Sequence, residues 1–303
     1  MDTLQNLKTF LAIARTENFS AAARQIGVAP SVVTKRINQL EHQMSARLFN
    51  RSTRKVNLTE TGEKYLPKVR DIIRDFDNVI AGTAESSSEL EGHLRIKTPT
   101  TTATTFLGPI FSSFQKTHPG ITLDVALLDR SVNPIEEGFD MALGALPTTF
   151  RGVVDVPLCA YPRIICASPE YLERAGTPTN PGDLIDHDCL TATPTGSTWS
   201  FESHRGPINI SVHSKYNAND SVMLFASALD GNGITIIPNY IADPAIADGT
   251  LVTFMEDFPV ANYWLKALVP ESRMKIPRVD AMLEWLKQEL SPAPWEKEGK
   301  KIT

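Results

Sequence analysis

A short alanine-rich helix, a tight turn and a polar-faced helix follow one another within residues 19–38, and this order constrains the fold more than any other feature of the sequence. The run Phe19-Ser20-Ala21-Ala22-Ala23 predicts the start of a helix, with Ser20 as its N-cap. Three consecutive alanines leave no bulk, so another helix can cross closely over them. Gly27 is suited to end this helix after about two turns. Residues 19–38 therefore predict a helix-turn-helix.

The helix after the turn separates apolar from polar residues, and Pro30 is favourable in its first turn. Its apolar residues step by four, three and four positions and predict one buried stripe: Val33, Ile37, Leu40 and Met44. The opposite face carries short polar side chains: Ser31, Thr34, Lys35 and Asn38. Such a face suits a helix that enters the DNA major groove, and the neighbouring Arg36 is placed to reach a phosphate.

A basic segment followed by a short strand comes next. Val56 and Leu58 alternate with polar residues as in a strand, and Arg51, Arg54 and Lys55 precede them. This pattern predicts the wing of a winged helix-turn-helix, whose cations neutralise phosphates without reading bases. The complete set of predicted DNA-binding residues combines the helix face, its neighbours and the wing: Ser20, Ser31, Val32, Thr34, Lys35, Arg36, Asn38, Arg51, Arg54 and Lys55.

Charge is distributed unevenly along the chain. The first sixty residues hold nine Lys or Arg and four acidic residues, a net charge of +5, whereas the whole chain of 303 residues has −5. A positive end on an acidic body suits contact with a polyanion at that end; a chance excess of solvated cations is the alternative.

Length and composition predict a multidomain cytoplasmic protein. A chain of 303 residues is too long to fold around one small hydrophobic core. Its fraction of apolar residues, 42%, is ordinary for a globular protein, and it contains no run of ~18 apolar residues that would predict a membrane span. Its first residues lack the pattern of a signal peptide. Cys159, Cys166 and Cys189 have no metal-ligand spacing, so neither a disulfide framework nor a metal site is expected.

The chain resembles the LysR-type transcriptional regulators over nearly its whole length. In the head, the resemblance lies in residues at fixed spacing: Phe10, Phe19-Ser20-x-Ala22-Ala23, Ile26, Val32-Val33-Thr34, Ile37, Leu40-Glu41, Leu48-Phe49-x-Arg51, Arg54, Leu58-Thr59 and Gly62. It implies a multidomain fold with an all-α winged helix-turn-helix head, a long linker helix, and a two-lobed α/β effector-binding domain resembling type 2 periplasmic binding proteins. The expected domains are the head over 1–60, the linker helix and hinge over 61–91, and the effector-binding domain over 92–303, with lobe I at about 92–160 and 266–303 and lobe II at about 161–265.

One position departs from the family pattern. Many members have Ser-Gln-Pro at the start of the recognition helix, where this chain has Ala29-Pro30-Ser31. The resemblance therefore implies DNA binding, but it does not imply the family's usual operator sequence.

Residues beyond the wing predict a long helix, with Thr59 as its cap. Its apolar residues step by three, four, three and four: Leu66, Val69, Ile73, Phe76 and Ile80. Because the run spans only about two heptads, periodicity allows either a coiled-coil seam or a helix lying on its own domain. The resemblance implies the seam, which pairs two heads into a dimer, with a homotetramer as the usual final assembly.

Strands and helices alternate from His93 onward, which predicts a mostly parallel sheet with helices on both faces. The expected strands are 93–97, 121–128, 140–145, 163–167, 234–238 and 263–269, and the expected C-terminal helix is 279–290.

Ligands of such folds bind outside the carboxyl ends of the strands. Thr100, Thr101 and Thr102 follow the strand ending at Lys97 and offer hydroxyl and backbone N–H donors to a carboxylate; simple capping of the next helix is the alternative. Arg163 is the best remaining cation. The resemblance adds further cleft residues: Ser131, Ala145, Ser197, Trp199, Phe201, Asn217 and Asn219. The resulting hypothesis is a small organic acid as effector, in particular an aromatic carboxylate. Some relatives have arginine at the position of Ala145, and because this chain lacks that cation, an effector with two negative charges is disfavoured.

Other classes of protein are less well supported. The chain has no Gly-x-Ser-x-Gly turn, no phosphate-binding glycine loop and no His-Glu-x-x-His motif, so neither an enzyme nor a cofactor is expected. A transport receptor would fit residues 93–290 but not the DNA-binding head. Two alternatives of the same fold stay open: a regulator without a small-molecule effector, and a thiol-redox regulator acting through its cysteines.

Four partners are expected: double-stranded promoter DNA, a small organic effector, further copies of this chain and RNA polymerase. No membrane partner is expected.

Overall fold

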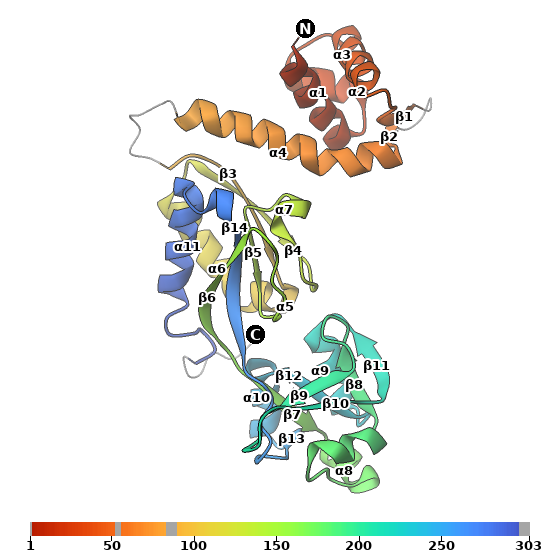
Figure 1. The fold of residues 1–303 in the computed structure, drawn as a ribbon, viewed down its shortest axis with the longest axis vertical. Coiled ribbons are helices and arrows are strands. Elements are labelled where there is room, and N and C mark those ends of the chain that lie inside the picture. Colours follow the sequence, from red (N-terminus) through yellow and green to blue (C-terminus); the bar gives the residue numbers. More distant parts are fainter. Residues whose placement is uncertain (1, 52–55, 83–89, 297–303) are drawn as a thin grey trace. The chain divides into compact units, whose positions relative to one another are not determined.

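Two compact units make up the chain (Figure 1). The computed structural model describes residues 2–51, 56–82 and 90–296. The N-terminal unit comprises Met1–Ser88 and the short segment Glu136–Gly138, and the second unit comprises Glu89–Ile135 and Phe139–Thr303. Each unit has hydrophobic clusters of its own.

The N-terminal unit is a helical head with a two-stranded wing. Its elements are α1 (Thr3–Thr16), α2 (Phe19–Ile26), α3 (Pro30–Gln43), β1 (Phe49–Arg51), β2 (Val56–Leu58) and α4 (Glu60–Gly82). The stripe predicted on α3 is confirmed, since Val33 and Ile37 are fully buried, Leu40 is nearly so and Met44 packs against the same cluster. Ala22 and Ala23 of α2 are also buried, and their small side chains let neighbouring helices approach.

The start of α2 differs from the expectation. Asn18, and not Ser20, is the N-cap: its side-chain oxygen accepts hydrogen bonds from the backbone N–H groups of Ser20 and Ala21, both at 2.9 Å. Asn18 has the extended backbone of a cap, whereas Ser20 already lies inside the helix, so the prediction for Ser20 was wrong. The helix ends at Gly27 in the left-handed region, as expected.

Glu41 connects α3 to the wing. Its carboxylate is buried, and Oε1 accepts hydrogen bonds from the backbone N–H groups of Leu48 (2.9 Å) and Phe49 (3.3 Å). The exposed Arg47 donates to Oε2 at 3.1 Å. β1 then pairs antiparallel with β2, with Phe49 opposite Leu58. One buried carboxylate thus satisfies two backbone donors at the start of the wing.

Thr59 caps α4, as expected. Its hydroxyl accepts from the Gly62 N–H at 3.0 Å and donates to the Arg47 carbonyl at 2.7 Å. Gly62 lies so close to the wing that a Cβ there would overlap the Leu48 carbonyl oxygen, so a glycine is required at this position.

The apolar stripe of α4 divides into a buried and an exposed part. Val69 and Ile73 are buried, and Val69 joins the core of the head. Phe76 is 42% exposed, with Lys8 Nζ 6.0 Å from its ring centroid, and the neighbouring Ile72 is 52% exposed. The side chain of Ile80 lies outside the described residues. The first half of the stripe therefore packs on its own domain, and Ile72 and Phe76 remain on the surface.

Removing the Glu41 carboxylate should destabilise the head. Glu41→Ala leaves two buried N–H groups without acceptors, and we expect it to lower the free energy of unfolding by about 3 kcal/mol. Arg47→Ala, which removes only the exposed partner, should cost less than about 1 kcal/mol. Urea unfolding of the full chain measures both, with amide hydrogen exchange at Leu48 and Phe49 as the local readout. Equal losses of unfolding free energy in the two variants would contradict the role of Glu41 as the acceptor of these two backbone N–H groups.

The C-terminal unit consists of two lobes, each built on a five-stranded sheet. The strands of lobe I, in sheet order, are β4 (Ile121–Leu127), β3 (Gly92–Thr98), β5 (Met141–Gly144), β14 (Tyr263–Pro270) and β6 (Val153–Tyr161). Those of lobe II are β11 (Ser214–Ala218), β8 (Cys189–Ala192), β12 (Ile234–Pro238), β7 (Arg163–Ala167) and β13 (Val252–Thr253). A separate pair is formed by β9 (Thr198–Phe201) and β10 (Ile208–Ser211).

Helices cover these sheets. In lobe I they are α5 (Thr100–Thr102), a π-helical turn (Ala103–Leu107), α6 (Gly108–Thr117), α7 (Pro134–Glu137), a 3₁₀ turn (Glu271–Arg273) and α11 (Pro277–Glu289). In lobe II they are α8 (Pro169–Ala175), a 3₁₀ turn (Pro181–Asp186), α9 (Ser221–Leu229) and α10 (Asn239–Ala247). Phe114 of α6 and Leu286 of α11 pack with Ile96 of β3 in the largest cluster of lobe I, and Figure 1 shows both helices beside its sheet. Among the described residues, no helix is both long and apolar enough to cross a bilayer.

Both sheets are mostly parallel, as expected, but each contains one reversed strand, β14 in lobe I and β7 in lobe II. In lobe I, β3 pairs in parallel with β4 and β5, but β14 runs antiparallel to β5 and β6. In lobe II, β8 pairs in parallel with β11 and β12, but β7 runs antiparallel to β12 and β13. Within these two five-stranded sheets, every antiparallel pair contains β7 or β14. These are the strands through which the chain enters lobe II and returns to lobe I, so the crossovers account for the reversed strands.

Candidate functional site

The polar face of α3 lies on the surface of the head. Ser31, Lys35 and Asn38 are exposed, and Val32 is 37% exposed. Thr34 is half-buried, and its hydroxyl donates to the Pro30 carbonyl one turn earlier at 3.2 Å. The face predicted for the major groove is therefore accessible, on a helix whose opposite side is anchored in the core.

The structure describes only some of the residues that the sequence predicts to contact phosphates. Arg36 is half-buried, and its guanidinium donates to the Thr9 hydroxyl of α1 at 3.4 Å. Ser20 is exposed on α2. Arg54 and Lys55 lie outside the described residues, and so does the side chain of Arg51.

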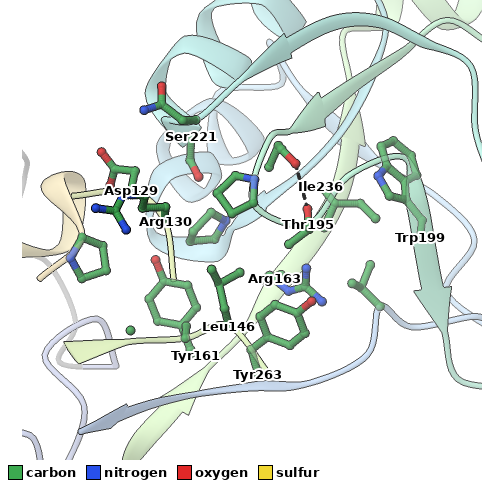
Figure 2. Close-up of a pocket in the computed structure, with 18 of the residues that line it drawn as sticks. Asp129, Arg130, Leu146, Tyr161, Arg163, Thr195, Trp199, Ser221, Ile236 and Tyr263 are labelled. Atoms are coloured by element: carbon green, nitrogen blue, oxygen red, sulfur yellow. Dashed lines mark hydrogen bonds between the residues drawn. The ribbon is translucent and has the colours of Figure 1, made fainter. Parts of the chain in front are cut away.

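A cavity of about 150 Å³ lies between the two lobes (Figure 2). The carboxyl ends of β3, β4 and β5 face it from lobe I, and those of β8, β11 and β12 from lobe II. Its lining residues come mainly from these ends, from β9 and from the crossovers: Lys97, Pro99, Asp129, Arg130, Gly144, Ala145, Leu146, Tyr161, Arg163, Leu190, Ala192, Pro194, Thr195, Thr198, Trp199, Ser200, Asn219, Ser221, Ile236, Pro238, Val260 and Tyr263.

Sequence reasoning found part of this lining. Four predicted residues line the cavity: Ala145, Arg163, Trp199 and Asn219. Seven lie outside the lining: Thr100, Thr101, Thr102, Ser131, Ser197, Phe201 and Asn217. Phe201 is buried in the core of lobe II, and Asn217 forms hydrogen bonds with Thr191 and Thr193. The prediction placed the site correctly at the carboxyl ends of the strands, but most side chains that line the cavity were not among the predicted residues.

The three threonines are occupied by internal partners. Thr100 gives its backbone N–H (2.8 Å) and its hydroxyl (2.5 Å) to the two carboxylate oxygens of Asp129. The Thr101 hydroxyl donates to Asp220 Oδ2 of lobe II at 2.6 Å. The internal carboxylates of Asp129 and Asp220 thus occupy the Thr100 and Thr101 donors that the sequence assigned to an effector. The threonine side chains do not cap the helix either, because the N-cap of α5 is Pro99, without a side-chain cap hydrogen bond.

Hydroxyl groups and rings join the lobes beside the cavity. The Tyr161 and Tyr240 hydroxyls lie 3.2 Å apart, and the Thr102 hydroxyl is within 3.3 Å and 3.4 Å of them. Burial raises the pKa of both tyrosines, so they stay protonated as donors near neutral pH. Trp295 stacks on Tyr240 and donates to the Ala160 carbonyl at 3.0 Å.

Arg163 is the predicted residue with the clearest potential for binding. Its guanidinium carbon lies 3.3 Å from the ring centroid of Tyr263, and Nη2 donates to the Ala261 carbonyl at 2.9 Å. Within the described part of the chain, its buried Nε has no hydrogen-bond partner. Burial lowers the pKa of this guanidinium, because desolvation penalises the charged form, and an anion bound beside it would relieve that penalty.

Several lining residues were missed by sequence reasoning. Lys97 is 4% exposed, donates to the Leu143 carbonyl at 3.2 Å and contributes a cation from β3. A lysine inside a buried strand was the available signal. Asp129 and Arg130 follow β4 directly, next to the predicted Ser131. Tyr263 lies on a crossover, which the pattern of single strands does not reveal.

The three cysteines lie in the cores of the lobes. Cys159 is 6% exposed, and Cys166 and Cys189 are fully buried. Burial raises the pKa of each thiol to about 12. Since the thiolate is the reactive form, this environment disfavours the thiol-redox alternative.

The thiols should react slowly in the native protein. At neutral pH, the raised pKa reduces the thiolate fraction about a thousandfold relative to an ordinary cysteine. We expect an aromatic disulfide reagent to label all three cysteines rapidly in concentrated guanidinium chloride but none of them rapidly in the folded chain. Fast labelling of any one of them in the folded chain would revive the redox alternative.

Comparisons with known proteins agree with the arrangement of both units. A family model described as "LysR substrate binding domain" matches residues 87–291, and one described as "Bacterial regulatory helix-turn-helix protein, lysR family" matches residues 4–63. The uncharacterized HTH-type transcriptional regulator YhjC of Escherichia coli is 30% identical over 292 residues, covering 94% of this chain and 97% of that protein. The HTH-type transcriptional activator TtdR of Escherichia coli is 26% identical, covering 94% of each protein.

Two solved structures share the fold. The LysR-type transcriptional regulator CrgA from Neisseria meningitidis has a TM-score of 0.56 at 26% identity, covering 94% of this chain and 98% of that one. The full-length virulence activator AphB of Vibrio cholerae has a TM-score of 0.59 at 21% identity, covering 93% of this chain and 98% of that one.

Proposed function

The chain belongs to the LysR family of bacterial transcriptional regulators, and we propose that it binds promoter DNA through the exposed face of α3 and responds to a small molecule in the cavity between its lobes. It is a regulator and not an enzyme.

The exposed polar face of α3 is the observation that carries the DNA-binding part of the proposal. Thr34 and Lys35 lie on that face, while Val33 and Ile37 hold the opposite side in the core. The wing cations Arg51, Arg54 and Lys55 are proposed as phosphate contacts on their sequence positions alone. The Arg36 guanidinium already donates a hydrogen bond to the Thr9 hydroxyl. Lys35 is therefore favoured over Arg36 as a phosphate contact on α3.

Substitutions on α3 should weaken DNA binding without unfolding the head. We expect Lys35→Ala and Thr34→Ala each to lower affinity for the promoter about tenfold, which is the cost of losing one base or phosphate contact. Lys275→Ala, a matched change at an exposed lysine of the second unit, should have no effect. Footprinting on DNA that flanks the protein's own gene measures the loss, and light scattering checks the assembly. Unchanged footprints in both α3 variants would overturn the assignment.

We propose that copies of this chain pair through α4. Ile72 and Phe76 are the exposed apolar residues one turn apart on this helix that support the pairing. A homotetramer and contact with RNA polymerase are further proposals, based on the family alone.

The cavity is the observation that favours an effector over effector-independent regulation. A space of about 150 Å³ accommodates one small ring, and the lining combines aromatic and aliphatic walls with a few charged groups. Trp199 and Tyr263 supply aromatic surface, and Arg163 supplies a cation. Since both lobes contribute to the lining, a bound molecule can shift the balance between their arrangements.

Filling the cavity should prevent effector binding. We expect calorimetry on the full chain to detect 3-phenylpropanoate, a one-ring carboxylate, and Ala145→Phe to weaken its binding at least about tenfold by occupying the space. Ala175→Phe, at an exposed alanine at the end of α8, is the matched control and should bind normally. Equal binding by both variants would place the ligand elsewhere, and DNA footprints of Ala145→Phe should remain those of the unsubstituted protein.

A further inference from the structure

Asp129 is the single carboxylate among the described residues that line the cavity, where three cations accompany it: Lys97, Arg130 and Arg163. Asp129 belongs to lobe I, two residues beyond the end of β4, and Arg163 opens β7 in lobe II. The parallel register of β3 and β4, with Thr98 opposite Leu127, brings Asp129 to the start of the helical segment at Thr100. Figure 2 shows Asp129 and Arg163 as separate polar positions around the cavity.

The position of Asp129 is fixed by two hydrogen bonds. Its Oδ1 accepts from the Thr100 N–H at 2.8 Å and its Oδ2 from the Thr100 hydroxyl at 2.5 Å. An ionised carboxylate has about four acceptor positions, so each of these oxygens retains one for a further donor. The backbone donor that could hold an effector's acid group here is already taken, and a second carboxylate would be repelled by the first.

We propose that Asp129 determines effector specificity: the effector binds with its acid group at Arg163 and presents a hydrogen-bond donor, an amine or a hydroxyl, to Asp129. The ligand class is therefore a one-ring α-amino or α-hydroxy acid, and a plain carboxylate is the weaker ligand. This inference rests on the proposed effector function of the cavity.

The charges of the lining support this orientation. The buried Nε of Arg163 has no hydrogen-bond partner in the described part of the chain, so an acid group beside it gains a charge-assisted hydrogen bond. The lining also contains apolar side chains, among them Leu146 and Ile236, which suit the body of the ligand. A ligand with an acid alone would satisfy Arg163 and leave Asp129 desolvated without a new partner.

A matched set of probes tests the inference on the full chain by calorimetry. 3-Phenylpropanoate carries the acid alone, L-phenyllactate adds a hydroxyl, and L-phenylalanine adds an ammonium group on the same carbon. We expect the unsubstituted protein to bind L-phenylalanine or L-phenyllactate about tenfold more tightly than 3-phenylpropanoate, the ratio supplied by one charge-assisted hydrogen bond.

Three variants test whether Asp129 causes that preference. Asp129→Asn keeps an acceptor for the Thr100 N–H but removes the charge, and we expect it to abolish the preference and to improve binding of 3-phenylpropanoate. Asp220→Asn is the matched control, because Asp220 also accepts a threonine hydroxyl but lies outside the lining, and the preference should persist. Arg163→Gln should weaken all three acids by a similar factor.

The outcomes separate the inference from the proposed function. Equal binding of the three probes, or a preference that survives Asp129→Asn, overturns the role of Asp129 while the cavity remains an effector site. Failure of all three probes to bind at millimolar concentration overturns the cavity as a site for one-ring acids, and the inference with it.

Discussion

Two crossings of the chain between the lobes set the geometry on which the effector unit depends. The strands that precede each crossing run parallel, so their carboxyl ends collect at one edge of each sheet. The crossings themselves supply β7 and β14 as antiparallel partners and place Tyr161, Arg163 and Tyr263 in the wall of the cavity. The cavity is thus a product of topology: loops that follow parallel strands form two sides, and the crossovers form a third.

Internal carboxylates satisfy backbone donors at several points in this chain. Asp129 occupies the start of the helical segment at Thr100, Asp220 caps α9, and Glu41 takes the first N–H groups of the wing. Each of these donors is consumed within the fold. In the proposed effector site, an external acid would therefore be held by a side-chain cation such as Arg163 and not by these backbone donors.

The sequence predicted elements well where the residues themselves carry the signal. The stripe of α3, the Gly27 terminus and the Thr59 cap are local features, and the structure contains all three. Contacts between distant residues were less predictable. Thr100 and Asp129 are neighbours only through the register of two strands, which no local pattern specifies. The stripe of α4 has correct periodicity, but periodicity does not distinguish the core of the head from a partner helix, and Val69 belongs to the core. Asn18 was overlooked because Ser20 is also a good capping residue by type.

The Glu41 carboxylate has a mechanical consequence for the head. It anchors α3, which carries the side chains proposed to face the major groove, to the first strand of the wing. Gly62 brings α4 against the carbonyl of Leu48 beside that strand. Rotating α3 within the head would break two buried hydrogen bonds. These contacts hold α3, the first strand of the wing and α4 in one arrangement within the head. Under the proposed function, a signal that leaves the head folded would therefore move α3 and the wing together.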